Sequence, residues 1–528
     1  MKNIINILNF IRAVEPRLGR NIDLYKPVAE QIRIMKKWGL KGTFLLQYDT
    51  LCDEKMLALL QDIPQDSERG LWLETVQPQV EAAGLLWRGQ YPWDWHNDVG
   101  FLIGYTPEER KKLIDVHMEK FRKIYGSYPA VAGSWHIDAF SIQYLYDKYH
   151  IKACCICRDQ IGTDGYTMQG GYYNQAYYPS KNNMFCPAQT REMQIDVPVF
   201  RMLGSHPAFA YDYQLFSYDS VNSLLPTLEP AVNSVAFGKQ LLEEIFCGSG
   251  LAFQYTQIGQ ENSFGWDKMC DGIAFQFEKV AAYEKEGKAE IMTLGEAGQW
   301  YKENFALTPA AAVISQKPWE KNNVRSYWYS SRFYRINVFA EDNILRIRDM
   351  YLFDENYPEH YLTQRCDSPS CEFRNLPVFD GALYSDKENG LRAGIYFCHG
   401  KEKIVWDEIT YQEDVPGKSA KITLKKQNEY TVLRLFEQKA ELTSNIKDLT
   451  LVPVYAADNV YGKKGTRDGT FANGNGKASI SYIQKAVVSD QRADFLFDGF
   501  RYGFALQAGR INSDGSLSPQ NGTLTVTL

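Results

Sequence analysis

The amino-acid sequence predicts an α/β fold, a (β/α)7–8 barrel followed by a C-terminal antiparallel β-sandwich domain. Three observations lead to this fold class. The chain has 528 residues, more than one ordinary domain contains. Up to about residue 305, short apolar segments alternate with amphipathic ones, which is the pattern of parallel βα units. Beyond residue 323, many short alternating segments are separated by turn residues, which is typical of a sandwich.

The barrel is expected to contain eight buried strands with helices between them. The strands are expected at 4–14, 42–48, 70–75, 130–135, 151–157, 195–203, 251–258 and 290–294. The helices are expected at 27–38, 107–125, 141–149, 239–245 and 273–283, where apolar residues recur at helical spacing. In such barrels the loops after the strand carboxyl ends build the active site. The residues that follow each strand are therefore the candidates for function.

Three units follow from this pattern. Residues 1–305 form the barrel, 306–323 a linker containing Ala and Pro clusters, and 324–528 the sandwich. The strands of the sandwich are expected at 334–339, 344–352, 394–398, 403–406, 421–424, 430–436, 449–454, 478–483 and 522–528.

The composition narrows the classes of function. The formal net charge is −6 and no basic run stands out, so the sequence offers no electrostatic basis for nucleic-acid binding. No apolar run reaches the length of a membrane-spanning helix, and no membrane partner is expected. Aromatic residues make up 14%, with 34 Tyr and 11 Trp, and their rings stack on the C–H faces of sugars. A large core with many strands accounts for the same aromatic content.

The N-terminus and the cysteines indicate a reducing compartment. The apolar start of the chain is broken by three Asn and leads into Arg12, so it reads as a first strand rather than a signal peptide. Cys154, Cys155 and Cys157 crowd into one apolar strand, as buried reduced thiols do. Cys366 and Cys371 could pair, but no complete zinc site surrounds them. We therefore expect a cytoplasmic protein.

The first three strand ends carry charged side chains. Strand one is followed by Glu15 between Arg12 and Arg17, a cluster that suits sugar binding or catalysis. A structural ion pair at the barrel rim is the other interpretation. Asp49 follows strand two and Glu74 follows strand three, and both are expected near the barrel mouth unless they cap helices.

A loop across the mouth is expected at 88–98. In an extended segment Asp94, His96 and Asp98 would share one face and could hold a divalent ion. The loop also contains Trp95 among Pro and Gly residues, so a sugar-binding loop fits equally well.

Strands four and five are followed by polar and aromatic residues. Trp135 could form a platform for a sugar, His136 could orient a carboxylate, and Asp138 could act in catalysis or cap the next helix. After strand five, the long segment 158–179 begins near Asp159 and is dense in Tyr, Asn and Gln. Loops of this length are usually functional, and we expect it to bind substrate.

Strand seven is followed by Glu261, in a polar segment without an adjacent basic residue. Tyr255 and Phe264 could desolvate its carboxyl group and raise its pKa, which suits a general acid. The alternative is a solvated surface acid.

The first three hundred residues resemble the glycoside hydrolase/deacetylase barrel superfamily, on strand order, on Gly-Thr-Phe-Leu-Leu at 42–46 and on the following sandwich. That superfamily includes NodB-type polysaccharide deacetylases, family-57 amylase-like hydrolases and family-38 mannosidases. The deacetylases carry paired Asp after strand one and an HxxxH pair, and both features are missing here. Family-38 enzymes carry His-x-Asp at strand one, whereas His136-Ile137-Asp138 follows strand four. The resemblance therefore disfavours metal-dependent chemistry.

Family-57-like enzymes work without metal, with a nucleophile after strand four and an acid after strand seven. The positions that correspond are Asp138, where the family has Glu, and Glu261. We therefore expect a glycoside hydrolase without cofactor or metal, in which Glu261 protonates the leaving oxygen and Asp138 attacks or activates water. Glu15 is the substitute for either role.

The expected partner is a carbohydrate substrate, and association with further copies of the chain is left open. The residues expected to bind the substrate are Arg17, Asp49, Glu74, Trp95, His96, Trp135, His136 and Asp159. Retention and inversion of configuration both stay open. The alternatives are a metal-dependent carbohydrate deacetylase that uses Asp94, His96 and Asp98 or His136 and Asp138, and a sugar-binding protein without catalysis.

Overall fold

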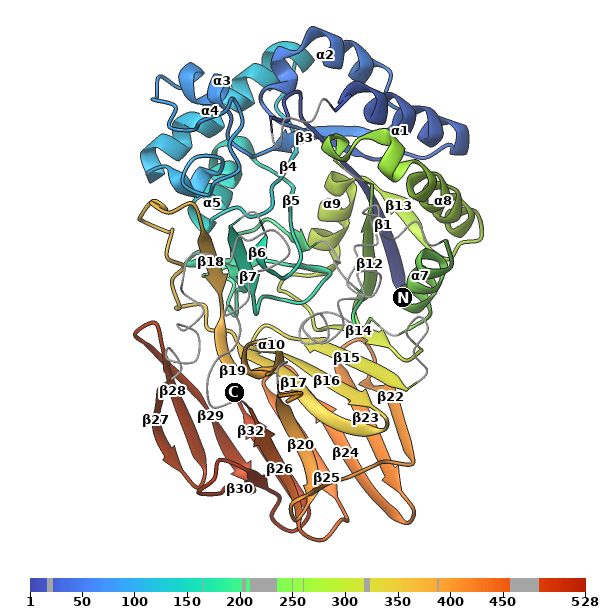
Figure 1. Cartoon of the computed structure of the whole chain (residues 1–528), viewed down its shortest axis with the longest axis vertical. Coiled ribbons are helices and arrows are strands. Elements are labelled where there is room, and N and C mark those ends of the chain that lie inside the picture. Colours follow the sequence, from blue (N-terminus) through green and yellow to red (C-terminus); the bar gives the residue numbers. More distant parts are fainter. Residues whose placement is uncertain are drawn as a thin grey trace.

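The structure is a computed structural model of the whole chain. It describes residues 1–16, 22–163, 165–201, 206–208, 235–248, 250–259, 261–317, 323–386, 389–455 and 484–528. Arg17 and the strand expected at 478–483 lie outside these ranges. Figure 1 shows helices around a sheet in the upper half of the molecule and antiparallel strands in the lower half.

A curled, mainly parallel sheet forms the centre of the N-terminal half. Its order is β12-β1-β2-β3-β4-β5-β11-β8, with β13 paired to β1 and β8 antiparallel to β11. The strands are β1 (Lys2–Ile11), β2 (Thr43–Leu46), β3 (Glu68–Trp72), β4 (Val131–Gly133), β5 (Ala153–Ile156), β8 (Ala176–Tyr177), β11 (Val199–Arg201), β12 (Phe253–Ile258) and β13 (Glu290–Met292). All eight strands expected in this half coincide with these elements. In the residues that the structure describes, no backbone pairing joins the two ends of the sheet, so it is a half-barrel and the expected closure is not shown.

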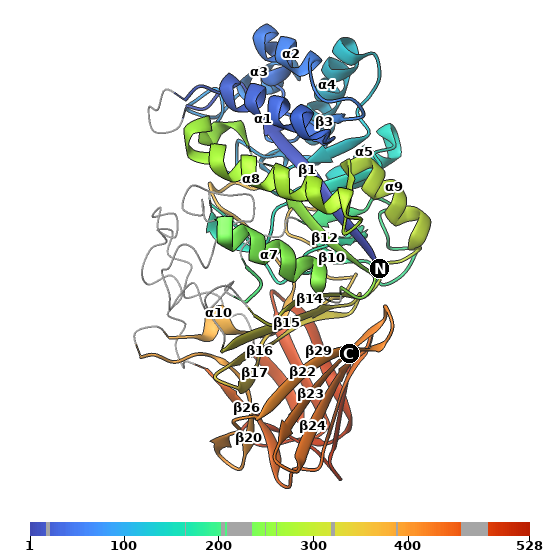
Figure 2. The ribbon, with the colours of Figure 1, turned by 90° about the vertical axis from the view of Figure 1, so that its right-hand side faces the viewer.

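Helices cover the outside of this sheet (Figures 1 and 2). They are α1 (Tyr25–Trp38), α2 (Glu54–Gln61), α3 (Gln77–Ala82), α4 (Pro107–Tyr125), α5 (Ala139–Tyr149), α7 (Val235–Cys247), α8 (Trp266–Lys285) and α9 (Leu294–Asn304). Short 3-10 turns occur at Thr50–Cys52, Leu102–Gly104 and Asn262–Phe264. Local sequence sets the helix ends. Helix α4, for example, starts at a capping box between Thr106 and Glu109 and stops at Gly126, whose φ is 82°.

The C-terminal half consists of antiparallel sheets (Figure 2). The larger sheet has the order β14-β15-β16-β17-β20-β26-β31-β30, with β19 and β21 paired to its side, and the second has the order β22-β23-β24-β25-β32-β29-β28-β27. The first comprises β14 (Ala311–Ser315), β15 (Val324–Ser330), β16 (Tyr334–Glu341), β17 (Ile344–Leu352), β19 (Leu376–Asp380), β20 (Gly394–His399), β21 (Glu402–Lys403), β26 (Leu449–Val454), β30 (Arg510–Ile511) and β31 (Leu517–Ser518). The second comprises β22 (Glu408–Val415), β23 (Ser419–Lys426), β24 (Glu429–Leu435), β25 (Lys439–Ser444), β27 (Gln484–Ser489), β28 (Arg492–Phe497), β29 (Phe500–Ala508) and β32 (Thr523–Thr527). One apolar core contains side chains from both, among them Ile336 and Leu433.

The two halves are joined by more than the connection around β14. Residues 353–374, which we call the crossing segment, leave β17 and pack on the N-terminal half before they return through β18 (Cys371–Arg374). Strand β18 pairs in parallel with β7 (Tyr166–Gln169), which in turn pairs with β6 (Gln160–Thr163). Phe353, Cys371 and Phe373 belong to the core of the N-terminal half. The remaining elements are β9 (Pro179–Ser180), β10 (Asn183–Pro187) and the short α10 (Gly381–Tyr384).

The structure differs from two expectations about local structure. The segment 158–179 was expected as one long loop, but it contains β6, β7 and β8. Cys366 and Cys371, expected as a candidate pair, are both free thiols. None of the helices among the described residues is long and apolar enough to cross a membrane.

Candidate functional site

Three glutamates from three different strand ends converge on Arg12, the first residue after β1. Nη2 of Arg12 donates to Oε2 of Glu74 at 3.0 Å and to Oε2 of Glu261 at 3.0 Å. Nη1 donates to Oε2 of Glu15 at 3.2 Å. Glu15 follows β1, Glu74 follows β3 and Glu261 follows β12, which are near neighbours in the order of the sheet. The carboxyl edge of the sheet therefore carries the cluster, as expected for a fold of this kind.

Arg12 and these three glutamates, which we call the Arg12 cluster, are buried. The Arg12 side chain is 2% exposed, and the three glutamate side chains are 1–4% exposed. Burial alone would lower the pKa of Arg12, but Glu261, Glu74, Glu15 and Asp49 together raise it above its ordinary value. Arg12 thus stays charged beside several acidic groups. Buried ionisable groups whose pKa is shifted by charged neighbours gather at functional sites.

The loop after β12 is shaped to bring Glu261 to Arg12. Gly259 has a φ of 98°, and a Cβ at this position would lie 2.2 Å from the carbonyl oxygen of Leu8. Only glycine therefore allows β12 to end against β1. Asn262 then accepts a hydrogen bond from the Arg12 amide at 3.0 Å and donates to the Arg12 carbonyl at 2.8 Å. Ser263 Oγ also lies 2.5 Å from Oε1 of Glu261.

Glu74 is held by several donors. The indole Nε1 of Trp135 donates to Oε1 of Glu74 at 2.7 Å, and the Gln47 amide lies 3.4 Å from Oε2. Trp135 follows β4 and is half-buried, with its ring edge-to-face against that of Trp72 at 5.0 Å between centroids. The structure thus brings Trp135 and Glu74, both predicted as substrate-binding residues, into direct contact with each other.

Asp49 supports the loop that carries Glu15. Its Oδ2 accepts from the amides of Ala13 at 3.0 Å and Val14 at 2.9 Å, and its Oδ1 accepts from the amide of Thr50 at 2.7 Å. Asp49 therefore also starts a 3-10 turn, as the capping alternative expected. Burial raises the pKa of Asp49 to about 6, against the opposing effect of these amides and of Arg12.

Aromatic rings extend outward from Arg12. The ring of Trp93, a residue not singled out from the sequence, lies 4.2 Å from the Arg12 guanidinium carbon. Trp95 is half-buried, with its ring 6.1 Å from that of Trp93, and it stacks on Tyr91 at 5.9 Å and 13°. Tyr91 is 41% exposed, so the series leads from the buried guanidinium to solvent. Alternation of Trp with polar residues at 91–95 is the signal that could have found Trp93.

His96 and Asp94 are engaged with each other rather than with the Arg12 cluster. Nδ1 of His96 lies 2.7 Å from Oδ1 of Asp94, and Asp94 also accepts from the amides of Gln90 and His96. Asp94 therefore fastens its own loop. Among the described residues, no three His, Cys, Asp or Glu side chains converge in a way that could hold a metal ion.

Asp138 lies in a different environment from the one expected of a catalytic residue. Its side chain is fully buried, and Oδ1 accepts from Arg110 Nη1 at 2.9 Å and from the Ser141 amide at 2.9 Å. Ser141 Oγ donates to Oδ2 at 2.7 Å. Asp138 is the N-cap of α5, the alternative that the sequence left open. Both of its oxygens are occupied by groups that hold the fold, so we do not assign it a catalytic role.

His136 is enclosed by the crossing segment. Its Nε2 lies 3.0 Å from Oδ1 of Asn97, and the rings of Phe101 and Phe373 lie 4.4 Å and 5.3 Å away. Burial lowers the pKa of His136 to about 3, so the imidazole is neutral at ordinary pH. Its described neighbours are core residues, and Phe373 comes from a distant part of the chain that sequence reasoning could not place beside it.

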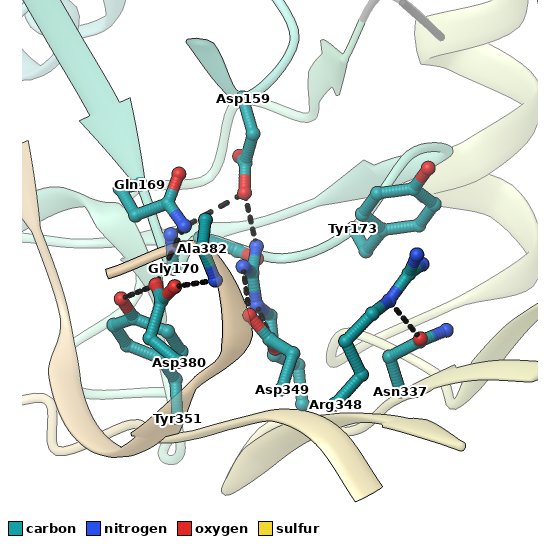
Figure 3. A network of polar contacts seen from close by, with 12 residues as sticks. Asp159, Gln169, Gly170, Tyr173, Asn337, Arg348, Asp349, Tyr351, Asp380 and Ala382 are labelled. Atoms are coloured by element: carbon teal, nitrogen blue, oxygen red, sulfur yellow. Dashed lines mark hydrogen bonds and ion pairs between the residues drawn. The ribbon is translucent and has the colours of Figure 1, made fainter. Parts of the chain in front are cut away.

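Asp159 belongs to a polar network between the two halves (Figure 3). It pairs with Arg201 at 2.7 Å and with Arg335 of β16, and Arg335 forms a two-pronged pair with Asp349 at 2.9 Å and 2.8 Å. In Figure 3, Asp159 points down toward Asp349 from the N-terminal half. The structure thus places Asp159, predicted as a substrate-binding residue, in the contact between the halves.

A second part of this network centres on Asp380. Tyr351 and Gln169 both donate to Oδ2 of Asp380, Gln169 at 2.7 Å (Figure 3). Burial, with further contributions from Asp380 and Asp159, raises the pKa of Asp349 to about 8 against the effect of Arg335. The network therefore joins β7, β16, β17 and β19 across the boundary between the halves.

Sequence comparison finds no relative: no family model matches the chain, and no curated protein matches it. Among solved structures, a candidate glycoside hydrolase/deacetylase from Parabacteroides distasonis has a TM-score of 0.49 and 14% identity, over 73% of this chain and 93% of that one. A candidate polysaccharide deacetylase from Mycobacterium smegmatis has a TM-score of 0.35 and 10% identity, over 57% and 90%. The 4-alpha-glucanotransferase from Thermococcus litoralis has a TM-score of 0.32 and 9% identity, over 100% and 98%. These likenesses concern the fold alone, at the level of the resemblance noted from the sequence.

Proposed function

We propose that the chain is a glycoside hydrolase whose chemistry is carried out by two carboxylates of the Arg12 cluster. The observation that carries this proposal is the convergence of Glu15, Glu74 and Glu261 on one buried guanidinium at the carboxyl edge of the sheet. Cleavage of a glycosidic bond passes through an oxocarbenium-like transition state. It requires one carboxyl group that donates a proton and one carboxylate that stabilises or captures the positive charge.

We assign the acid role to Glu261. Its Oε1 lies 2.5 Å from Ser263 Oγ, and a hydroxyl group can either donate to an ionised carboxylate or accept from a protonated one. The Ser263 hydroxyl can therefore stay hydrogen-bonded to Glu261 before and after proton transfer. This supports its use as the group that protonates the leaving oxygen and later activates water.

We assign the nucleophile role to Glu74, in place of the Asp138 expected from the sequence. Trp135 donates to Oε1 of Glu74 at 2.7 Å, and a hydrogen bond donated to a carboxylate favours its ionised form. A carboxylate held in this way is oriented toward a fixed position. Glu15 contacts the same guanidinium and is the third acid of the site. It is suited to bind a hydroxyl group of the substrate.

The geometry also supports a stereochemical outcome. Oε2 of Glu74 and Oε2 of Glu261 each lie 3.0 Å from the same nitrogen of Arg12. These two oxygens are therefore no farther than about 6 Å apart, which fits the roughly 5–5.5 Å separation of retaining glycosidases better than the wider one of inverting enzymes. We propose that the enzyme retains the configuration of the anomeric carbon.

The test is turnover of a panel of aryl glycosides by the wild type and by Glu261→Gln, Glu74→Gln and Asp138→Asn, each with and without a chelator. We expect aryl release to be lost in the first two variants and kept in the third, with the chelator having no effect. Acetylated sugars are included in the panel. Deacetylation that the chelator abolishes would replace this proposal with the deacetylase alternative.

Two further outcomes would also contradict the assignment. Aryl release that survives in both Glu261→Gln and Glu74→Gln would exclude the Arg12 cluster as the catalytic centre. Loss in Asp138→Asn alone, with a melting temperature equal to that of the wild type, would restore the role expected from the sequence.

A further inference from the structure

A pocket lies where three separate parts of the chain meet, and it shares no residue with the Arg12 cluster. The crossing segment contributes Tyr357, Glu359, His360 and residues 372–374, β10 contributes Asn183, and the end of β28 contributes Phe497 with Asp498 after it. The cavity has a volume of about 110 Å³ and is partly open to solvent. Ligand pockets occur preferentially where separate parts of a fold meet. Figure 1 shows β18 at the margin of the molecule, between α5 above and β28 below.

The charged groups that line the pocket are paired with each other. Arg374, whose side chain is 9% exposed, forms an ion pair with Glu372, and the His360 imidazole contacts the Asp498 carboxylate. The fifth group, Glu359, accepts from the amides of Ala139 and Met184 at 2.8 Å each. Burial, with a contribution from the nearby Asp138, raises the pKa of Glu359 to about 8. The lining therefore offers both hydrogen-bond donors and hydrogen-bond acceptors.

The apolar part of the lining is aromatic. Tyr357, Phe373 and Phe497 all line the pocket, and the rings of Tyr357 and Phe497 lie 6.3 Å apart at 57°. Aromatic faces and edges contact the C–H groups of a sugar ring, while carboxylates and guanidinium groups bind its hydroxyls. A charged ligand would meet Arg374 and Glu372, whose charges already balance each other. A purely apolar ligand would leave the polar groups desolvated without partners.

We propose that this pocket binds one neutral sugar ring, as a carbohydrate-binding site separate from the catalytic centre. The sugar contacts Tyr357 and Phe497 with its apolar face. Its hydroxyl groups bind Arg374 and Glu372 at one side and the exposed pair of His360 and Asp498 at the other. This goes beyond the proposed hydrolase activity, because a site of this kind would hold a glycan whether or not the Arg12 cluster cleaves it.

The experiment is saturation-transfer NMR on the full chain with methyl glycosides as probes. The panel contains the neutral methyl glycosides of glucose, galactose, mannose, xylose and N-acetylglucosamine, with methyl glucuronide and glucosamine as charged controls. We use the wild type, Glu261→Gln, Asp498→Ala and Arg374→Gln. Asp498 and His360 are exposed at the surface, so Asp498→Ala tests the pocket without disturbing the core.

We expect at least one neutral glycoside to give saturation transfer in both the wild type and Glu261→Gln. In Asp498→Ala we expect its affinity to fall about ten-fold, the effect of losing one good contact. We expect the charged controls to bind more weakly. If Arg374→Gln lowers the melting temperature, its weaker binding reports on folding rather than on the pocket. The affinities of Asp498→Ala and of a matching His360→Ala then decide.

The proposal is overturned by any of three results. The first is that no neutral glycoside gives saturation transfer. The second is transfer that Glu261→Gln abolishes, which would place the sugar at the catalytic centre. The third is transfer that Asp498→Ala and His360→Ala both leave unchanged.

Turnover of aryl glycosides by Asp498→Ala is measured in parallel. Because it reports on the Arg12 cluster alone, failure of this proposal and failure of the proposed hydrolase are distinguishable.

Discussion

Glu74 and Glu261 are bound by the same nitrogen, Nη2 of Arg12, at 3.0 Å each, although they follow strands that lie on opposite sides of β1 in the sheet. This relationship makes Arg12 the residue that sets the spacing of the two proposed catalytic carboxylates. Removal of Arg12 would take away the guanidinium that these buried carboxylates share.

Arg12→Gln should destabilise the protein by about 3–5 kcal/mol, because removal of one partner leaves the other buried charges uncompensated. Chemical denaturation measures this loss. In the double variant with Glu74→Gln the loss should be smaller than the sum of the two single losses, because Glu74→Gln removes one of the orphaned charges. Additive losses would contradict the coupling inferred from the contacts.

Asp138→Ala should lower stability through loss of the N-cap and of the Arg110 pair, and should leave turnover per folded molecule unchanged. Asp53→Ala is the control, because Asp53 caps α2 by accepting from the Met56 amide at 2.8 Å and has no buried arginine partner among the described residues; it also accepts from the Tyr25 hydroxyl at 2.9 Å. Such a cap contributes about 1 kcal/mol. Asp138→Ala should cost more than this control. An equal cost would mean that Arg110 finds another partner in the variant.

Asp49 should make stability depend on pH. Its pKa in the folded protein is about 6, above the ordinary value of 3.8, so the folded state binds the proton more tightly than the unfolded one. The contribution of Asp49 is fully present below pH 4 and is lost as the pH rises through 6, by about 3 kcal/mol at most. Asp49→Asn should remove this slope. Urea midpoints of both proteins between pH 4 and 7 measure the difference, and parallel curves would contradict the shift.

Arg335→Leu should weaken the contact between the two halves of the molecule. Arg335 is fully buried and pairs with Asp159 and Asp349, so we expect a loss of about 3–5 kcal/mol in the free energy of unfolding. Lys425→Ala is the control, because Lys425 pairs with Glu408 at 2.8 Å, both side chains are about half exposed, and such pairs contribute about 0–1 kcal/mol. Limited proteolysis should cleave Arg335→Leu faster than either the control or the wild type.

Trp95→Ala tests the aromatic series that leads from Arg12 to solvent, and it rests on the proposed hydrolase. Trp95 stacks on the exposed Tyr91, away from the carboxylates, so its loss should weaken binding without changing the chemistry. We expect KM to rise about ten-fold for an oligosaccharide glycoside, with kcat unchanged. A fall in kcat with constant KM would indicate that Trp95 acts on the Arg12 cluster through Trp93.

Much of the local structure could be predicted because it depends on neighbouring residues. The apolar period of 2–11 and the helical period of 107–125 are complete within short windows, and the structure has a strand and a helix there. The cap at Asp138 follows from a side chain and an amide three residues apart. The location of candidate residues after strand ends follows from the general geometry of parallel sheets.

The choice among those residues could not be predicted, because it depends on contacts between distant parts of the chain. The sequence indicated that Glu74, Asp138 and Glu261 all follow strands, but the order of the sheet decides that Glu74 and Glu261 reach Arg12. Asp138 is instead bound by Arg110, a residue of the preceding helix. Whether Asp138 lies beside Arg110 depends on how α4 and α5 pack together, and no local sequence pattern specifies that packing.

The sequence by itself therefore determined the alternation of strands and helices, the helix ends and the set of acids available at the strand ends. The tertiary structure alone decided which acids share a cation and which are buried as structural partners. The crossing segment shows the reason, since Phe373 encloses His136 although the two lie far apart along the chain. Secondary structure is set by hydrogen bonds and apolar spacing within a few residues, whereas the ionisation and role of a side chain depend on every group that folding brings around it.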